Sequence, residues 1–220
     1  MSQQVTLTFD NGPTRVTAQV LDVLAERGLP ATFFVVGDQL RRPGARALAE
    51  RALAEGHRIG NHSLTHSTPL GVRDDPAEAA REIDEMQALL GDLVRGERFF
   101  RPFGGGGIID PNLLGRHALE RLVKGEYTCV LWNSVPRDWE HPSHWPDTCL
   151  ADVATREWSV VVLHDLPTGA MDRLPAFLDS LGARDIEVVH ELPDDCVPLR
   201  LGRPTRGLDA LTWLAEGSAG

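Results

Sequence analysis

The sequence predicts an α/β protein with a mostly parallel β-sheet, because apolar strands alternate with helical segments along the whole chain. A second observation is that polar side chains lie at or after the ends of five predicted strands, as Asp10, His62, Arg101, Asp138 and His164. Third, 220 residues with 42% hydrophobic residues are typical of one globular domain, which we expect to cover 1–220. Seven strands suit a barrel slightly smaller than the eight-stranded type, or an open doubly wound sheet.

The individual elements follow from hydrophobic spacing and turn residues. Strands are predicted at 5–10, 31–36, 58–61, 98–101, 127–132, 159–164 and 186–189. Helices are predicted around 16–24, 48–53, 76–92, 111–123 and 171–181. Two of them open with an Asp-Pro pair, an N-cap followed by a proline in the first turn. The proline-rich segments 137–149 and 192–206 are predicted as long loops.

Composition narrows the choice of partners. A net charge of −10 disfavours nucleic acids and anionic membranes, since no basic face is available to release counterions. No apolar run approaches the roughly 18 residues that span a bilayer, and no secretory signal is visible. The three cysteines are widely spaced, which argues against a disulfide framework and a thiolate zinc site. We therefore expect a cytoplasmic protein with Cys129 buried; the sequence predicts no oligomeric state.

The first strand ends in Thr8-Phe9-Asp10-Asn11-Gly12-Pro13. This places a carboxylate at the carboxyl end of a strand, just before a tight turn, where α/β enzymes gather their catalytic groups. The next residue is an amide, Asn11. A carboxylate at this position, beside Asp10, would have indicated a metal site clearly. Asp10 is therefore a candidate catalytic residue.

Two histidines follow the third predicted strand with a spacing of four residues, as His62 and His66. That spacing puts both imidazoles on one face if the turn is helical, which suits a metal site. The alternative is a pair of polar histidines on a surface turn. Their position on the same rim as Asp10 favours the functional interpretation.

Three further strand ends carry chemistry. Arg101 leads through Pro102 and Phe103 into four glycines, whose N–H groups suit an oxyanion, or which form only a flexible loop. Asp138 and Trp139 follow the fifth strand, and a fully apolar strand delivers His164, which could also be a structural histidine. Five such strand ends together predict an active site.

In order, Thr8–Pro13, Ala31–Val35, Gly56–His66, Arg101–Gly104, Asp138-Trp139 and Leu163-His164 resemble the motifs of the polysaccharide deacetylase family, the NodB-homology or carbohydrate esterase family 4 type. The resemblance covers roughly 5–165. It implies a distorted (β/α)7 barrel and metal-assisted hydrolysis of an N- or O-acetyl group. The divalent metal, usually zinc, would be held by Asn11, His62 and His66.

The resemblance also implies roles for the remaining residues. Asp10 would be the general base that deprotonates the attacking water, with Arg101 orienting and charge-balancing it. His164 would protonate the leaving amine, and Asp138 would hold and tune its imidazole.

The last implied roles concern the acetyl group. The backbone near Phe103 and Gly104 would stabilise the oxyanion, and Trp139 and Leu163 would wall the acetyl pocket. Acid and base on opposite sides of the carbonyl, from distant strands, suit amide hydrolysis.

The chain departs from the family pattern in ways that bear on its chemistry. Asn11 replaces the metal-binding aspartate, which removes one negative charge from the site. We expect a lower metal affinity, a different preferred metal, or a site that works without metal. Arg-Pro-Phe-Gly-Gly replaces the usual Arg-Pro-Pro-Tyr-Gly type of motif, which alters the substrate wall.

Three functions remain open from the sequence. The first is a metal-dependent deacetylase acting on a small or soluble N-acylated substrate such as an amino sugar. The second, motivated by Asn11, is a metal-independent hydrolase of the allantoinase or cyclic-imide type. The third is a non-catalytic carbohydrate-binding relative. Trp132, Trp139 and Trp145 could stack on sugar rings or could be ordinary core residues.

Overall fold

The computed structural model describes residues 3–211, apart from the side chains of 209 and 210. Within it the chain forms two compact units. The first contains residues 3–35, 39–59 and 132–192. The second contains 36–38, 60–131 and 193–211. Each unit carries its own strands and helices, so we describe the two in turn.

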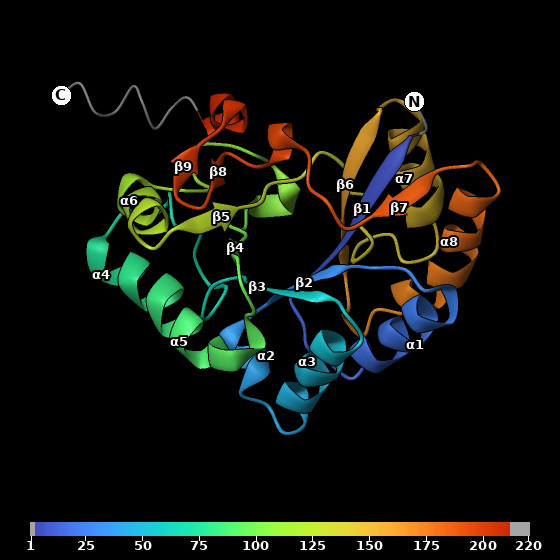
Figure 1. Cartoon of the computed structure of the whole chain (residues 1–220), viewed down its shortest axis with the longest axis horizontal. Helices are drawn as coiled ribbons and strands as arrows, with labels where there is room; N and C mark the ends of the chain where they lie inside the picture. Colours follow the sequence, from blue (N-terminus) through green and yellow to red (C-terminus); the bar gives the residue numbers. More distant parts are fainter. Residues whose placement is uncertain (1–2, 212–220) are drawn as a thin grey trace. The chain divides into compact units, whose positions relative to one another are not determined.

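Strand β1 (Gln4–Asp10) organises the first unit (Figure 1). It runs parallel to β6 (Trp158–His164) along its whole length, from Gln4 beside Trp158 to Asp10 beside His164. Its other edge pairs in parallel with β7 (Glu187–Val189) near its start and with β2 (Thr32–Val35) near its end. The parallel arrangement predicted for these strands is confirmed.

Four helices pack one against the next beside these strands, in the order α3, α1, α8, α7 (Figure 1). They are α3 (Ala45–Ala54), α1 (Thr17–Arg27), α8 (Leu174–Gly182) and α7 (Trp145–Ala154). Helix α1 buries the predicted apolar stripe, including Val20, Leu21 and Leu24. It ends at Gly28, whose left-handed φ of 61° is the usual helix-terminating conformation.

The second unit contains the end of β3 (Arg58–Asn61), then β4 (Arg98–Phe100) and β5 (Tyr127–Cys129), in parallel. A continuous helical segment precedes β4. It consists of α4 (Pro76–Ala79), a π-helical stretch η1 (Ala80–Glu85), α5 (Met86–Leu90) and a 3-10 turn η2 (Gly91–Leu93). Helix α6 (Arg116–Lys124) packs on α4, η1 and β5.

The remaining elements are short. They are α2 (Gly37–Leu40), η3 (Gly105–Gly107), η4 (Ala170–Arg173), η5 (Asp194–Cys196), β8 (Leu199–Arg200), β9 (Arg203–Pro204) and η6 (Arg206–Leu211). Strand β8 pairs antiparallel with β5 and β9 antiparallel with β8. The described chain thus has nine strands rather than the seven predicted.

Both predicted loops are partly wrong. The segment 137–149 becomes helical at Trp145, with Pro146 in the first turn of α7, where its missing N–H costs nothing. The segment 192–206 contains β8 and β9. Within these two-residue strands, hydrophobic alternation is too brief to be recognised.

The predicted helix 111–123 begins five residues late, at Arg116. Asp110 accepts a hydrogen bond from the Asn112 N–H at 2.8 Å, which forms a turn instead of a helix start. The N-terminus of α6 is capped from elsewhere, because the carboxylate of Asp74 accepts from the His117 N–H at 2.9 Å. By contrast, Asp75 caps α4 as predicted, accepting from Ala77 and Glu78.

Two smaller predictions also shift. The strand predicted at 127–132 ends at Cys129, and the helix predicted at 171–181 starts with the 3-10 turn η4 before α8 begins. All three cysteines are buried, as predicted for Cys129, and no disulfide joins them within residues 3–211.

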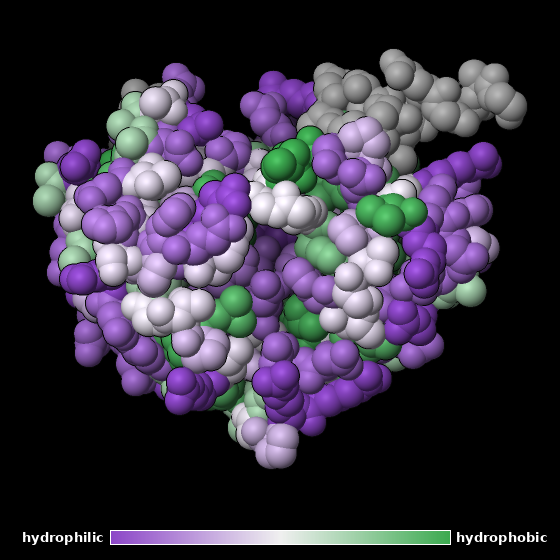
Figure 2. Space-filling view, turned by 180° about the vertical axis from the view of Figure 1, so that it is seen from behind, coloured by the Kyte–Doolittle hydropathy of each residue, from purple (hydrophilic) through white to green (hydrophobic). Residues whose placement is uncertain are grey.

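Hydrophilic residues cover most of the face shown in Figure 2, and hydrophobic ones form small separate patches. The large hydrophobic side chains with most exposed surface are dispersed along the chain, at Val72, Ile108, Val123 and Leu201. Within residues 3–211, no helix combines the length and hydrophobicity needed to cross a bilayer.

Candidate active site

In the first unit, Asp10 and His164 end two neighbouring strands in register. They are Cα partners at the carboxyl ends of β1 and β6, and both side chains are largely buried. Paired residues on adjacent parallel strands point to the same face of the sheet, so the carboxylate and the imidazole project together. The prediction that they come from distant strands is therefore wrong, since β1 and β6 are direct neighbours.

Asp138 fixes the orientation of His164. One of its carboxylate oxygens accepts from the His164 backbone N–H at 2.9 Å, and the other lies 2.8 Å from Nδ1 of the ring. With the carboxylate as acceptor, Nδ1 carries a proton, and Nε2 becomes the nitrogen that can exchange one with a substrate. Trp139 packs edge-on against the same ring, with centroids 4.7 Å apart.

The charges around His164 act in opposing directions. Burial is the largest influence and lowers the pKa of His164. The hydrogen bond and charge of Asp138, together with the charges of Asp10 and Asp165, outweigh it and raise the pKa above the ordinary 6.5. An imidazole that stays protonated above its usual range suits a general acid.

Asn11 adopts a left-handed backbone conformation with φ of 72°, which asparagine tolerates better than most residues. Its side-chain oxygen Oδ1 is buried and has no hydrogen-bond partner among residues 3–211. A buried carbonyl oxygen without a donor costs free energy unless another electrophile occupies that position. An amide oxygen of this kind can coordinate a divalent cation.

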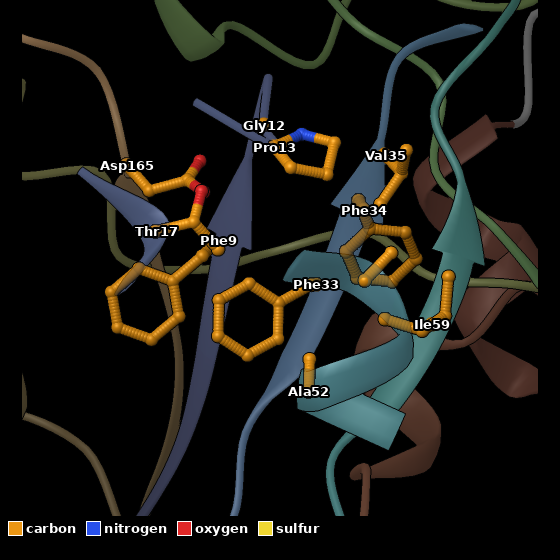
Figure 3. Close-up of a pocket in the computed structure, with 11 residues that line it drawn as sticks. Phe9, Gly12, Pro13, Thr17, Phe33, Phe34, Val35, Ala52, Ile59 and Asp165 are labelled. Atoms are coloured by element: carbon orange, nitrogen blue, oxygen red, sulfur yellow. The ribbon is translucent and has the colours of Figure 1, made fainter. Parts of the chain in front are cut away.

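Asp165 is a buried carboxylate for which the sequence predicts no role. The Thr17 hydroxyl donates to its Oδ2, and the Thr14 hydroxyl donates to its backbone carbonyl. Figure 3 shows its carboxylate facing the Gly12–Pro13 turn beside Thr17. Burial raises the pKa of Asp165 to about 6, opposed by the Thr17 hydrogen bond. The position of Asp165 directly after His164 is the one sign in the sequence of a role at the site. Its contact with Gly12 cannot be predicted, because it depends on the register of β1 and β6.

In the second unit, His62 and His66 are brought together without a helix. The segment is a bend in which Ser63 and His66 have φ values of 69° and 54°. The two ring centroids lie 4.9 Å apart. Nδ1 of His62 lies 2.8 Å from the carbonyl oxygen of Arg101, so Nδ1 donates there and Nε2 bears the lone pair. The prediction that a helical turn brings the two histidines together is wrong, but their imidazole rings do lie close to each other.

Two buried side chains hold this bend in place. Glu82, from the π-helical stretch, accepts from the Thr65 N–H at 2.8 Å and from its hydroxyl at 2.9 Å. Asn61 accepts from the Ser63 N–H at 3.0 Å and donates to the Ile83 carbonyl at 2.9 Å. Short π-helical segments are frequent beside functional sites, and this one supports the histidine bend.

The segment after β4 lies beside the same histidines. Arg101 is fully buried, and its guanidinium donates to the carbonyls of Val130 and Leu131 at 3.3 and 3.2 Å. The Phe103 ring stacks on His66 with centroids 3.8 Å apart. Gly104 is needed sterically, since a Cβ there would lie 3.1 Å from the Leu113 side chain and closer to the Ile108 carbonyl.

The structure therefore collects the predicted residues into one group in each unit. Asp10, Asn11, Asp138, Trp139 and His164 belong to the first, and His62, His66, Arg101, Phe103 and Gly104 to the second. Leu163 is fully buried and, by strand alternation, faces away from His164, so its role as a pocket wall stays a prediction.

Two of the three tryptophans considered for sugar stacking are core residues. Trp132 is buried, and Trp145 is buried with its indole N–H donating to the Ala170 carbonyl at 2.9 Å. Trp139 retains partial exposure. Among residues 3–211, no three His, Cys, Asp or Glu side chains form a group suited to a metal ion.

Comparison with known proteins agrees with this chemistry. A model of the polysaccharide deacetylase family matches residues 2–114. The chain is 38% identical over 170 residues to a chitooligosaccharide deacetylase of Sinorhizobium fredii, covering 73% of this chain and 71% of that one. It is 28% identical over 195 residues to a peptidoglycan-N-acetylglucosamine deacetylase of Bacillus cereus, covering 84% and 68%.

A solved structure of a polysaccharide deacetylase from Bacillus cereus matches with a TM-score of 0.70 and 27% identity, over 86% of this chain and 93% of that one. The fold and these relatives define a hydrolase of the deacetylase class. The chain belongs to the polysaccharide deacetylase family. The resemblance found in the sequence is confirmed, as is the mixed α/β fold class of this family.

Proposed function

We propose that this protein removes the acetyl group from an N-acetylated amino sugar or a similar small acylated substrate, with a bound divalent metal. The observation that carries the proposal is the pairing of Asp10 with His164 in register, with His164 held by Asp138. Relatives named as chitooligosaccharide and peptidoglycan-N-acetylglucosamine deacetylases support an acetylated sugar as the substrate class.

The two ends of the acid–base pair have different tasks. Asp10 takes the proton from the attacking water, because it is the carboxylate at the end of β1. His164 gives a proton to the leaving amine through Nε2, while Asp138 keeps Nδ1 protonated and the ring oriented. The raised pKa of His164 keeps that proton available near neutral pH.

Asn11, His62 and His66 are the proposed metal ligands. Their chemistry fits a divalent cation, since two imidazoles and an amide oxygen are suitable donors. The unsatisfied buried Oδ1 of Asn11 and the Nε2 lone pair of His62 each support the assignment. Deacetylases of this family are generally metal-dependent, and we propose zinc. A bound metal would lower the pKa of water and polarise the acyl carbonyl.

The remaining residues shape the acyl site in this proposal. The backbone N–H groups near Phe103 and Gly104 receive the developing oxyanion, and Arg101 orients Asp10 and balances its charge. Trp139, which already packs on His164, and Leu163 line the space for the acetyl methyl group. These roles come from the family motifs, and the contact of Trp139 with His164 supports the role of Trp139.

The test is acetate release from N-acetylglucosamine oligomers by protein reconstituted with one equivalent of zinc. We expect turnover that exhaustive chelation abolishes and that His62→Ala reduces strongly. Full activity after chelation would exclude the metal-dependent form. Turnover of ureides or cyclic imides without acetate release would favour the metal-independent alternative, and sugar binding without turnover would favour the binding relative.

The proposed setting is the cytoplasm, with the sugar as the partner rather than nucleic acid or a membrane. Two buried thiols, Cys129 and Cys149, support a reducing compartment, because buried cysteines persist there without forming disulfides. Fractionation of the native host with an antibody against the chain tests this, and recovery outside the cytoplasm would contradict it.

A further inference from the structure

A groove with a volume of about 570 Å³ opens in the first unit. Its walls come from the loop after β1 at 13–15, from the segment 39–48 that runs from the end of α2 into α3, and from the loop after β6 at 166–167. Small-molecule sites commonly have volumes of about 300–1,000 Å³. The groove is therefore large enough for part of a sugar and its substituents.

Two arginines, Arg15 and Arg42, line this groove, and none of its lining residues is acidic. Across residues 3–211, no ion pair holds either guanidinium, although most arginines of this acidic chain are paired with carboxylates. A net charge of −10 would repel an anion from most of the surface. The two arginines of this groove, which form no ion pair within residues 3–211, make it a place where an anion is attracted instead.

The rest of the lining is suited to the body of a ligand. Pro13, Pro43, Leu48, Leu166 and Pro167 supply apolar surface beside the two cations. Helix α3 also begins at this groove, at Ala45, without a side-chain cap, so its first N–H groups add partial positive charge there. Apolar walls with a few convergent polar groups are the usual composition of a ligand site.

The groove adjoins the proposed acid–base pair in sequence and in the fold. Pro13 follows Asp10 by three residues, and Leu166 follows His164 by two. Three residues of chain span at most about 11 Å. One molecule can therefore place its acyl group between Asp10 and His164 and its far side in the groove.

We propose that Arg15 and Arg42 bind an anionic oxyacid group, a phosphate or a carboxylate, on the side of the substrate away from its acyl group. The proposal rests on the proposed deacetylase function and specifies its substrate as an acidic acylated sugar. Guanidinium groups match the oxygens of both anions with paired hydrogen bonds.

The experiment compares three substrates with zinc-loaded protein: N-acetylglucosamine, N-acetylglucosamine 6-phosphate, and the same sugar with a 3-O-lactyl carboxylate. The variant is Arg15→Ala/Arg42→Ala. Its matched control is Arg173→Ala/Arg184→Ala, which removes two exposed arginines of the same unit outside the groove. The anionic sugar with the higher kcat/KM shows whether the two arginines bind a phosphate or a carboxylate.

We expect wild type to prefer an anionic sugar. The groove variant should lower kcat/KM for that sugar by about tenfold, or about 1.4 kcal/mol, and leave the neutral sugar unchanged. The control variant should change neither, and added salt should reduce the preference because exposed charges are screened. Equal kcat/KM for neutral and anionic sugars, unaltered in the groove variant, would overturn the inference while leaving the deacetylase function intact.

Absence of acetate release from every sugar would instead count against the proposed function. The groove is then judged by calorimetric titration of N-acetylglucosamine 6-phosphate, which requires no turnover. Binding that weakens about tenfold in the groove variant alone supports the anion site. Binding that is absent, or equal in wild type and variant, overturns it.

Discussion

The carboxylate of Asp165 lies directly against the Cα of Gly12. A Cβ built on Gly12 would be 2.6 Å from Cγ of Asp165 and closer still to both of its carboxylate oxygens. Asp165 is fully buried and is held by the Thr17 hydroxyl, so it is not the movable end of a surface side chain. The contact between Gly12 and Asp165 therefore joins the turn after Asp10 and Asn11 to the strand end that carries His164.

Gly12→Ala should destabilise the protein by about 1–3 kcal/mol, the usual cost of forcing an extra methyl group into a filled site. The measurement is urea unfolding. Gly182→Ala is the matched control, because a Cβ there meets nothing within 4 Å and the residue ends helix α8. The control should be neutral or slightly stabilising, and equal stability of both variants would contradict the prediction.

Asp138→Asn should shift the alkaline limb of the kcat/KM profile to lower pH. Wild-type His164 has a raised pKa because the hydrogen bond and charge of Asp138, with neighbouring charges, outweigh burial. Without that charge, burial dominates and the imidazole loses its proton earlier as the pH rises. Loss of the general acid should lower kcat about 10²-fold or more at pH 8.

The control for this profile is Asp172→Asn, at an exposed carboxylate on η4 of the same unit. It should leave both the limb and kcat unchanged. A limb that stays in place in Asp138→Asn, with kcat reduced, would mean that Asp138 supports the fold rather than the proton on His164.

The positions of Asp10 and His164 could be predicted because each residue is a polar side chain at the end of an apolar strand. Asp10 ends a strand of alternating residues, and His164 ends one that is apolar throughout. Their direct pairing could not be predicted, since it depends on which strands become neighbours. The same limit applies to Asp165, whose contact with Gly12 exists only in the β1–β6 register.

Glu82 illustrates a second limit. In the sequence it belongs to a charged stretch of a predicted helix and looks like a solvent-exposed residue. The π-helical insertion turns it inward, where it holds the Thr65 backbone and hydroxyl. The start of helix α7 illustrates a third limit, because Pro146 in a proline-rich segment indicates a loop, although proline in a first turn is also a helix-start signal.

His190 should make the protein less stable in acid. Burial, and then the charge of Arg58, lower the pKa of His190 to about 4, from 6.5 in the unfolded chain. The folded state therefore resists protonation, and the stability contributed above pH 6.5 is lost as the pH falls towards 4. His190→Gln keeps a donor for the Ala31 carbonyl and removes the titration.

Urea unfolding at pH 7 and pH 5 measures this effect. The loss of stability between the two pH values should be smaller in His190→Gln than in wild type by about 1 kcal/mol, a value discounted for the partial exposure of the ring. His144→Gln, at an exposed histidine, should behave as wild type. An identical pH dependence in all three proteins would exclude His190 as the source.

Asn11→Asp should strengthen metal binding and, at the same time, lower the stability of the metal-free protein. The added charge should tighten zinc binding by about tenfold or more, because carboxylates bind divalent cations better than neutral amides do. Without metal, a carboxylate replaces an amide whose buried Oδ1 already lacks a partner, so the desolvation cost of the apo form is larger. Aspartate tolerates the left-handed φ of 72° as asparagine does, so backbone strain does not confuse the comparison.

Thermal unfolding with chelator and with excess zinc separates these two effects. Relative to wild type, Asn11→Asp should have a lower Tm in chelator and a larger rise in Tm on adding zinc, since a ligand that binds only the folded state stabilises it according to its affinity. Asn112→Asp adds the same charge at an exposed position and should change neither value. If Asn11→Asp matched wild type in both conditions, Asn11 would not be a metal ligand, and its unsatisfied oxygen would need another explanation.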